Sequence, residues 1–260
     1  VIEAARNISC VGATPLAITD CLNFGNPERP EIAYQLTEAI RGMADACREL
    51  ELPVISGNVS LYNESQDGAI YPTPTVGMVG LLEDVERRNG AGFVSEGDQI
   101  FLLGSEDLES RIQDLGGSSY LSVIHGKISG APQLDFGLEK NVQGFIREAS
   151  NKDLINSAHD VSEGGLIVAI AESCIIGNMG ASISEPLPKE ASLDSCLFAE
   201  TPGRIVVSVS QTVANEFKSL AMESQIPIYS LGVVSGDKLK WADIIDVSLE
   251  SLKGAWEEAL

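Results

Sequence analysis

The chain has 260 residues, enough for one large or two medium domains with buried cores, and it carries 17 Lys and Arg against 38 Asp and Glu. The resulting formal charge of −21 would repel a nucleic-acid backbone or an anionic membrane surface, so we expect neither as a partner. No apolar run approaches the ~20 residues of a membrane span and no signal peptide is visible, so we expect a cytoplasmic protein. The five cysteines are irregularly spaced without a C-x-x-C pair, which predicts neither a disulfide framework nor a zinc site.

A helix is predicted at the very start of the chain. Residues 2–9 (IEAARNIS) have helical character and no capping residue before them, and the first residue is Val1 rather than a methionine. These observations indicate a piece of a longer polypeptide.

Two short apolar segments, PLAIT (15–19) and PVIS (53–56), each lead into a polar segment. Both are predicted to be strands that end in a turn, and the second is predicted to be buried because it is short, apolar and β-branched. In its turn, Gly57 lets the backbone approach a ligand closely and Asn58 adds an amide oxygen. Asp20, which ends the first strand, is a carboxylate of the kind that Mg²⁺ prefers. The pairing favours a bound nucleotide and metal, although from the residues alone such groups are more often turn or capping residues.

Regular elements continue on either side of the second segment. Residues 31–50 predict an amphipathic helix, because apolar side chains recur at steps of three and four and Pro30 suits a first turn. Residues 72–82 predict a strand that Gly77 and Gly80 interrupt, as is typical of a barrel or interface strand.

A polar, glycine-rich stretch at 86–92 is the best candidate for a linker, and it divides the chain into domains of residues 1–90 and 91–260. The charge run at 106–109 is expected to be solvated surface. The order of the later elements predicts α/β packing, and the fold class is α/β (α+β). Helices are predicted near 137–149, 162–177, 212–223 and 248–259, and strands at 98–104, 204–210 and 227–234.

Five motifs carry a resemblance to a known family. They are AITDCLNFGNPERPE (17–31), SGNVSLYNES (56–65), PTPTVGMVG (72–80), AHDVSEGGL (158–166) and AETPGRIVVSV (199–209). Together they resemble the small form of the synthetase subunit of phosphoribosylformylglycinamidine synthase, and the resemblance covers the C-terminal half of that enzyme only. It implies an aminoimidazole ribonucleotide synthetase-like half with a truncated N-terminal domain. In that family the enzyme is a pseudo-dimer of two halves, with its catalytic histidines in the N-terminal half.

The resemblance also implies roles for single residues. Asp20 and Gly57 would contact ATP, Asn58 would bind Mg²⁺, and Ser60 would touch the substrate, formylglycinamide ribonucleotide. All four would reach across the pseudo-dimer interface into the active site of the N-terminal half. From the residues alone, Ser60 offers only a hydroxyl that could equally satisfy its own backbone.

The activity that the resemblance implies is an ATP-dependent ligation in purine biosynthesis that converts formylglycinamide ribonucleotide to formylglycinamidine ribonucleotide. The implied partners are the N-terminal half of the same enzyme, a glutaminase subunit that supplies ammonia and a small accessory subunit. Two alternatives stay open. One is another phosphoryl-transfer enzyme of the same fold, and the other is a non-catalytic module that binds nucleotide or a neighbouring subunit.

The two histidines and Arg204 lie outside the segments PLAIT and PVIS. His159 stands beside Asp160, but Asp160 and Glu163 precede an apolar run with the spacing of a capping box, so Asp160 is predicted to cap a helix. By pseudo-symmetry Asp160 could instead line an auxiliary nucleotide site. His125 is expected at the surface, and Arg204 is expected to be an ion-pair partner.

Overall fold

The computed structural model describes residues 1–105, 112–184 and 193–258. The charge run predicted at 106–109 therefore lies outside the described residues. The chain separates into two compact units, an N-terminal unit of Val1–Ile8 and Ala13–Glu83 and a C-terminal unit of Ser9–Gly12 and Asp84–Leu260.

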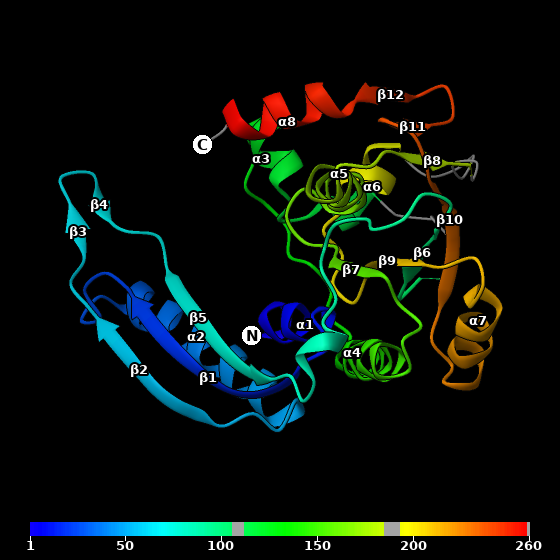
Figure 1. Ribbon diagram of the computed structural model, residues 1–260. Coiled ribbons are helices and arrows are strands. Elements are labelled where there is room, and N and C mark those ends of the chain that lie inside the picture. The colour runs from blue at the N-terminus through cyan, green and yellow to red at the C-terminus, as the bar shows by residue number, and fades with distance from the viewer. Residues whose placement is uncertain (106–111, 185–192, 259–260) are drawn as a thin grey trace. The chain divides into compact units, whose positions relative to one another are not determined.

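A three-stranded sheet forms the centre of the N-terminal unit (Figure 1). Its middle strand, β1 (Thr14–Asn23), pairs in parallel with β2 (Val54–Ser60) and antiparallel with β5 (Thr73–Leu81). A short hairpin, β3 (Glu64–Ser65) and β4 (Gly68–Ala69), lies between β2 and β5 in the sequence. The other elements are α1 (Ile2–Cys10) and α2 (Pro30–Glu49).

The helix predicted at 31–50 is confirmed as α2, and one face of β1 packs against it. Ile18 of β1 shares a buried cluster with Cys47, and Leu22 shares another with Ile32. Ile18 and Leu22 are four residues apart, so their side chains lie on the same face of β1. This is the face that α2 covers. The opposite face of β1 carries its odd-numbered side chains.

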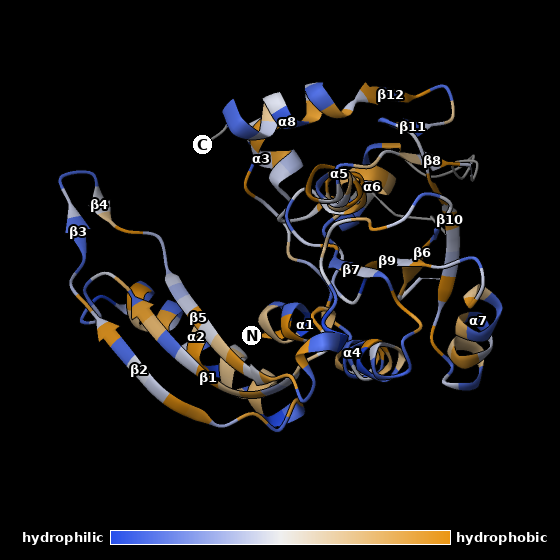
Figure 2. Ribbon diagram, viewed as in Figure 1, coloured by the Kyte–Doolittle hydropathy of each residue, from blue (hydrophilic) through white to orange (hydrophobic). Residues whose placement is uncertain are grey.

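A seven-stranded mixed sheet forms the centre of the C-terminal unit, in the order β12-β11-β8-β10-β6-β9-β7. Helices cover both of its faces, with α5, α6 and α8 above the sheet and α4 below it in Figure 1. Figure 2 shows α5 as hydrophobic over most of its length, as expected for a helix buried on several sides. The strands are β6 (Gln99–Leu103), β7 (Ser157–Asp160), β8 (Ala181–Ile183), β9 (Ile205–Val209), β10 (Ile228–Val234), β11 (Lys238–Trp241) and β12 (Ile245–Ser248). The helices are η1 (Val85–Arg87), η2 (Ile112–Leu115), α3 (Ser119–His125), α4 (Phe136–Asn151), α5 (Gly165–Gly177), α6 (Leu193–Phe198), α7 (Ala214–Glu223) and α8 (Leu249–Glu258).

Strand β6 shows why this sheet needs helices on both sides. Ile100 and Leu102 belong to the cluster under α5, whereas Phe101 and Leu103 belong to the cluster with α4 and α7. All four side chains are 0–1% exposed, so the strand appears in the sequence as an unbroken apolar run.

Most of the longer helices and strands were predicted from the sequence, whereas several short ones were not. The sequence did not predict β7, β8, β11 or β12, which have three or four residues each. Such lengths are too short for a periodic pattern to be recognised.

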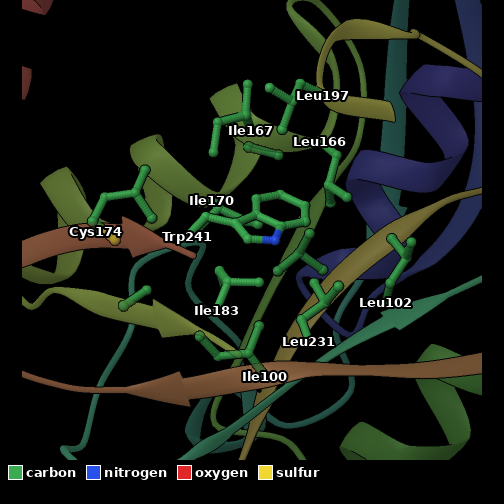
Figure 3. Close-up of a cluster of buried hydrophobic side chains, with 14 of the residues drawn as sticks. Ile100, Leu102, Leu166, Ile167, Ile170, Cys174, Ile183, Leu197, Leu231 and Trp241 are labelled. Carbon is green, nitrogen blue, oxygen red and sulfur yellow. The ribbon is translucent and has the colours of Figure 1, made fainter. Parts of the chain in front are cut away.

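The side chain of Trp241 is fully buried in the cluster under α5, among Ile170, Ile183 and Leu231 (Figure 3). We expect Trp241→Ala to lower the free energy of unfolding by about 3–5 kcal/mol, because the substitution leaves a large cavity. Trp256→Ala, at a half-exposed position of α8, is the matched control and should change it by less than about 1 kcal/mol. Urea unfolding followed by circular dichroism measures both. Equal losses for the two variants would contradict the packing described.

Candidate functional site

The predicted site residues lie side by side on the ladder between β1 and β2. The register pairs Asp20 with Gly57, Cys21 with Asn58, and Asn23 with Ser60. The turns predicted after residues 19 and 56 are therefore wrong, because both segments continue as strands that pair with each other. The buried environment predicted for residues 53–56 is also wrong, since Val54 and Ile55 are 54% and 63% exposed on an edge strand.

Asp20 and Gly57 lie on the face that α2 covers. Asp20 shares its face of β1 with the buried Ile18, two residues earlier. Burial raises the pKa of the Cys47 thiol on α2, and the charge of nearby Asp20 raises it further. A Cβ added at Gly57 would stand 2.7 Å from Asp20 Oδ1, which is closer than two such atoms can pack. The Asp20 carboxylate therefore lies over Gly57, and a side chain at residue 57 would displace it.

Asn58 and Ser60 lie on the opposite, open face of the sheet. Asn58 Nδ2 donates to Cys21 Sγ at 3.6 Å, and Asn23 Nδ2 donates to the same sulfur at 3.5 Å. Because the Asn58 amino group points to the sulfur, the oxygen of the same carboxamide points away from the sulfur. The register places nine small residues on this face, none of them charged: Ser56, Asn58, Ser60, Thr19, Cys21, Asn23, Thr73, Thr75 and Gly77.

The backbone of Gly57 points away from β1. Phe24 N donates to Ser60 O at 3.0 Å, and together with the parallel register this means that Asn58 and Ser60 direct their backbone groups toward β1. The N–H and C=O of Gly57 and Val59 consequently face the outer edge of the sheet, where β2 pairs with no further strand among the described residues. That edge offers backbone donors beside the Asp20 carboxylate, an arrangement that could contact a polar ligand.

A metal would find only a partial set of ligands here. Among the residues that the structure describes, no group of three or more His, Cys, Asp and Glu side chains could hold a metal ion. Asn58 fits as one neutral oxygen ligand of a hard cation such as Mg²⁺, which keeps several waters and takes much of its coordination from substrate phosphates.

In the C-terminal unit, His159 lies between two carboxylates. Its Nε2 is 3.1 Å from Glu172 Oε2, and its Nδ1 is 3.6 Å from Asp160 Oδ1. Burial lowers the pKa of His159, but Asp160 and Glu172 outweigh it and raise the pKa to about 9. The capping box predicted for Asp160 is wrong, because α5 has Gly164 as its N-cap and Asp160 is the buried last residue of β7. An auxiliary nucleotide site at Asp160 stays a prediction.

Glu200 was missed by the sequence analysis although it connects two helix starts. Its Oε1 accepts the N–H of Ser119 and the N–H of Gly164, both at 2.8 Å. Arg204, which was expected to form an ion pair, donates to the carbonyls of Ala199 and Thr201 on either side of Glu200. The partners of Glu200 are 36 and 81 residues away, so no local pattern could have revealed them. His125, as expected, is exposed.

Comparison with known families decides where the chain belongs. A model of the AIR synthase related protein C-terminal domain matches residues 95–242, and a model of the N-terminal domain of the same proteins matches residues 1–82. The chain belongs to the AIR synthase related protein family. Both matches agree with the α/β fold described above.

Individual relatives of this AIR synthase related chain are similar over its whole length. It is 48% identical to phosphoribosylformylglycinamidine synthase subunit PurL of Thermomicrobium roseum over 263 aligned residues, and 45% identical to PurL of Moorella thermoacetica over 265. Each alignment covers 100% of this chain but only 35% of the relative, so the chain spans about a third of the length of these proteins.

Solved structures share the fold. A structure described as T. maritima PurL complexed with FGAR matches with a TM-score of 0.74 and 20% identity, over 96% of this chain and 41% of that one. The hydrogenase maturation protein HypE matches with a TM-score of 0.65 and 16% identity, over 91% and 73% of the two chains.

Within the described part of the AIR synthase related chain, no helix is long and apolar enough to cross a membrane.

The contact between Asp20 and Gly57 can be tested by a pair of substitutions. We expect Gly57→Ala to lower the free energy of unfolding by no more than about 1 kcal/mol, because the new Cβ displaces the Asp20 carboxylate, which is the end of a flexible side chain beside an exposed strand. The same change made together with Asp20→Ala should carry no such penalty. Gly42→Ala, on α2 where an added Cβ meets nothing within 4 Å, is the control and should stabilise the protein slightly. Urea unfolding measures each variant, and an equal cost of Gly57→Ala with and without Asp20 would contradict the contact.

The His159 ion pairs predict a pH dependence of stability. The folded-state pKa of about 9 lies above the ordinary value of 6.5, so the stabilisation is fully present below pH 6.5 and is lost as the pH rises toward 9. The stabilisation that is lost over this pH range is on the order of 3 kcal/mol. We expect His159→Gln to remove this dependence and His125→Gln, at an exposed position, to retain it. Urea unfolding between pH 6 and about pH 9.5 measures the effect. A pH profile that His159→Gln leaves unchanged would show that other groups titrate.

Proposed function

We propose that the chain is the C-terminal half of the synthetase subunit of a phosphoribosylformylglycinamidine synthase and acts in the cytoplasm. The enzyme converts formylglycinamide ribonucleotide to formylglycinamidine ribonucleotide at the expense of ATP. The observation that carries this proposal is the β1–β2 ladder. It groups Asp20, Gly57, Asn58 and Ser60 in a chain that is similar to PurL over its whole length.

Four residues of the ladder have proposed roles. Gly57, with its free backbone groups, and Asp20, with its carboxylate above Gly57, contact ATP. Asn58 gives an amide oxygen to Mg²⁺, and Ser60 contacts the ribonucleotide substrate. Solved structures support these ligands by analogy, since they are described as T. maritima PurL complexed with ATP and, separately, with FGAR.

The chemistry that we propose is phosphorylation of the substrate amide oxygen, followed by displacement of phosphate by ammonia. Mg²⁺ would supply charge neutralisation on the transferring phosphoryl group. The residues of this chain position the nucleotide and hold polar donors and acceptors in fixed places, because the strands that carry them are hydrogen-bonded to each other. The small uncharged side chains of the open face leave room for a ligand to lie against the sheet.

The proposed assembly contains more than this chain. The N-terminal half of the same enzyme supplies the catalytic histidines, a glutaminase subunit supplies ammonia, and a small accessory subunit completes the assembly. One solved relative is described as PurLQS from Thermotoga maritima, which supports an assembly of this kind. We further propose that residues 1–90 and 91–260 act as the N-terminal-type and C-terminal-type domains of this half.

Reconstitution tests the proposed function directly. We expect the isolated chain to show no synthetase turnover, and its mixture with a separately produced N-terminal half to hydrolyse ATP only when formylglycinamide ribonucleotide is present. ATP hydrolysis that ignores the ribonucleotide would favour another phosphoryl-transfer enzyme. Nucleotide binding without any hydrolysis in the mixture would favour a non-catalytic module.

Asn58 provides the sharpest single substitution. In the reconstituted enzyme we expect Asn58→Ala to lower kcat by ~10²–10³ with little change in melting temperature, because one preorganised electrostatic contact is lost while the exposed strand stays intact. Ser56→Ala, two residues away on the same face of β2, is the matched control and should retain most activity. Measurement at several Mg²⁺ concentrations should show a higher requirement in the Asn58 variant alone. Full activity of Asn58→Ala would remove Asn58 from the site.

A further inference from the structure

Asn63 closes the end of the ladder that carries Ser60. It follows Tyr62, which adopts the left-handed conformation at φ 61°, a costly position for a bulky residue. This bend is held by Tyr62 N, which donates to Gly25 O at 3.1 Å, and by Asn63 N, which donates to Phe24 O at 3.1 Å. The bend turns the Asn63 side chain back toward the ends of β1 and β2.

The Asn63 carboxamide has more partners than its two amino protons can serve. Nδ2 is 2.9 Å from Ser60 O, 3.1 Å from Phe24 O and 3.1 Å from Ser60 Oγ. The amino group can only donate, so Nδ2 is the donor in all three contacts. Ser60 Oγ is also 3.1 Å from Asn63 Oδ1, which can only accept. The remaining consistent arrangement has the Ser60 hydroxyl donating its single proton to Asn63 Oδ1.

We propose that Asn63 is a positioning residue that makes Ser60 a hydrogen-bond acceptor toward the ligand. With its proton committed to Asn63, the hydroxyl presents only lone pairs to the open face. The ligand group that meets Ser60 is then an N–H or O–H donor, such as an amide or a sugar hydroxyl, and not an ionised phosphate. This inference rests on the proposed function, because it concerns how Ser60 meets the ribonucleotide.

The charges around Ser60 agree with a donor group rather than a phosphate. Arg29 reaches this turn through Glu64, and its guanidinium is 3.4 Å from Glu64 and 2.6 Å from Glu31. Glu64 is the residue directly after Asn63, so a carboxylate accompanies the turn. A phosphate at this place would meet a cation that two carboxylates already neutralise.

A double-mutant cycle in the full-length enzyme, assayed with ammonium salts, tests the positioning role. We expect Ser60→Ala to raise KM for formylglycinamide ribonucleotide by up to about tenfold and to leave KM for ATP unchanged. Asn63→Ala should raise the same KM, and the double variant should be no worse than the weaker-binding single variant. Asn26→Ala removes an amide that bonds Glu28 N instead, and it serves as the control. If the fold-increases in KM of the two single variants multiply in the double variant, the coupling of Asn63 to Ser60 is overturned.

A second measurement addresses the ligand group and does not depend on the Asn63 variant folding. Methyl phosphate carries the anion without N–H or O–H donors of the amide or sugar. We expect its inhibition constant against the ribonucleotide to be the same within about twofold in wild type and Ser60→Ala. A constant that rises in parallel with KM would show that Ser60 donates to phosphate, and it would overturn the inference while leaving the proposed function intact. If Ser60→Ala leaves KM for the ribonucleotide unchanged, the proposed role of Ser60 fails and the inference fails with it.

Discussion

The parallel register between β1 and β2 is the constraint on which the candidate site depends. Side chains alternate between the faces of a strand, so a shift of one residue would move every side chain of β2 to the other face. In the observed register, Gly57 lies under the Asp20 carboxylate and Asn58 lies beside Cys21. Burial of Ile18 and Leu22 against α2 fixes which face of β1 is covered, and the pairing with β1 then orients the side chains of β2.

This arrangement separates two kinds of chemistry across one sheet. The covered face and the outer edge present a carboxylate and free backbone groups, whereas the open face presents hydroxyls, amides and a thiol without charge. On a protein with a formal charge of −21, an uncharged face is where an anionic ligand meets the least local repulsion. In the C-terminal unit, whose sheet is covered on both sides, the largely buried His159 instead pairs with the Glu172 carboxylate.

The sequence predicted much of the fold where a pattern was long enough to be periodic. The apolar spacing of α2 and the mostly apolar, β-branched sequence of β9 identified both elements within two residues. The strand character of Gly57 and Asn58 could not be predicted, because glycine and asparagine are typical of turns and only the pairing with β1 keeps them extended. The same limit applies to Asp160, whose spacing from Glu163 matches a capping box although long-range pairing with β9 places it in a strand. The candidate ligands came from family motifs, whereas their distribution over two faces required the register.

The five cysteines occupy very different surroundings. Four are buried, and burial raises the pKa of Cys174 to about 12 and that of Cys196 to about 11, which keeps these thiols protonated and unreactive at neutral pH. Cys21 alone among the five is partly exposed, and its sulfur lies between the amides of Asn23 and Asn58. A thiol-directed fluorophore would therefore attach at this one position. The native chain thus carries its own attachment point for a spectroscopic reporter on the open face of the ladder.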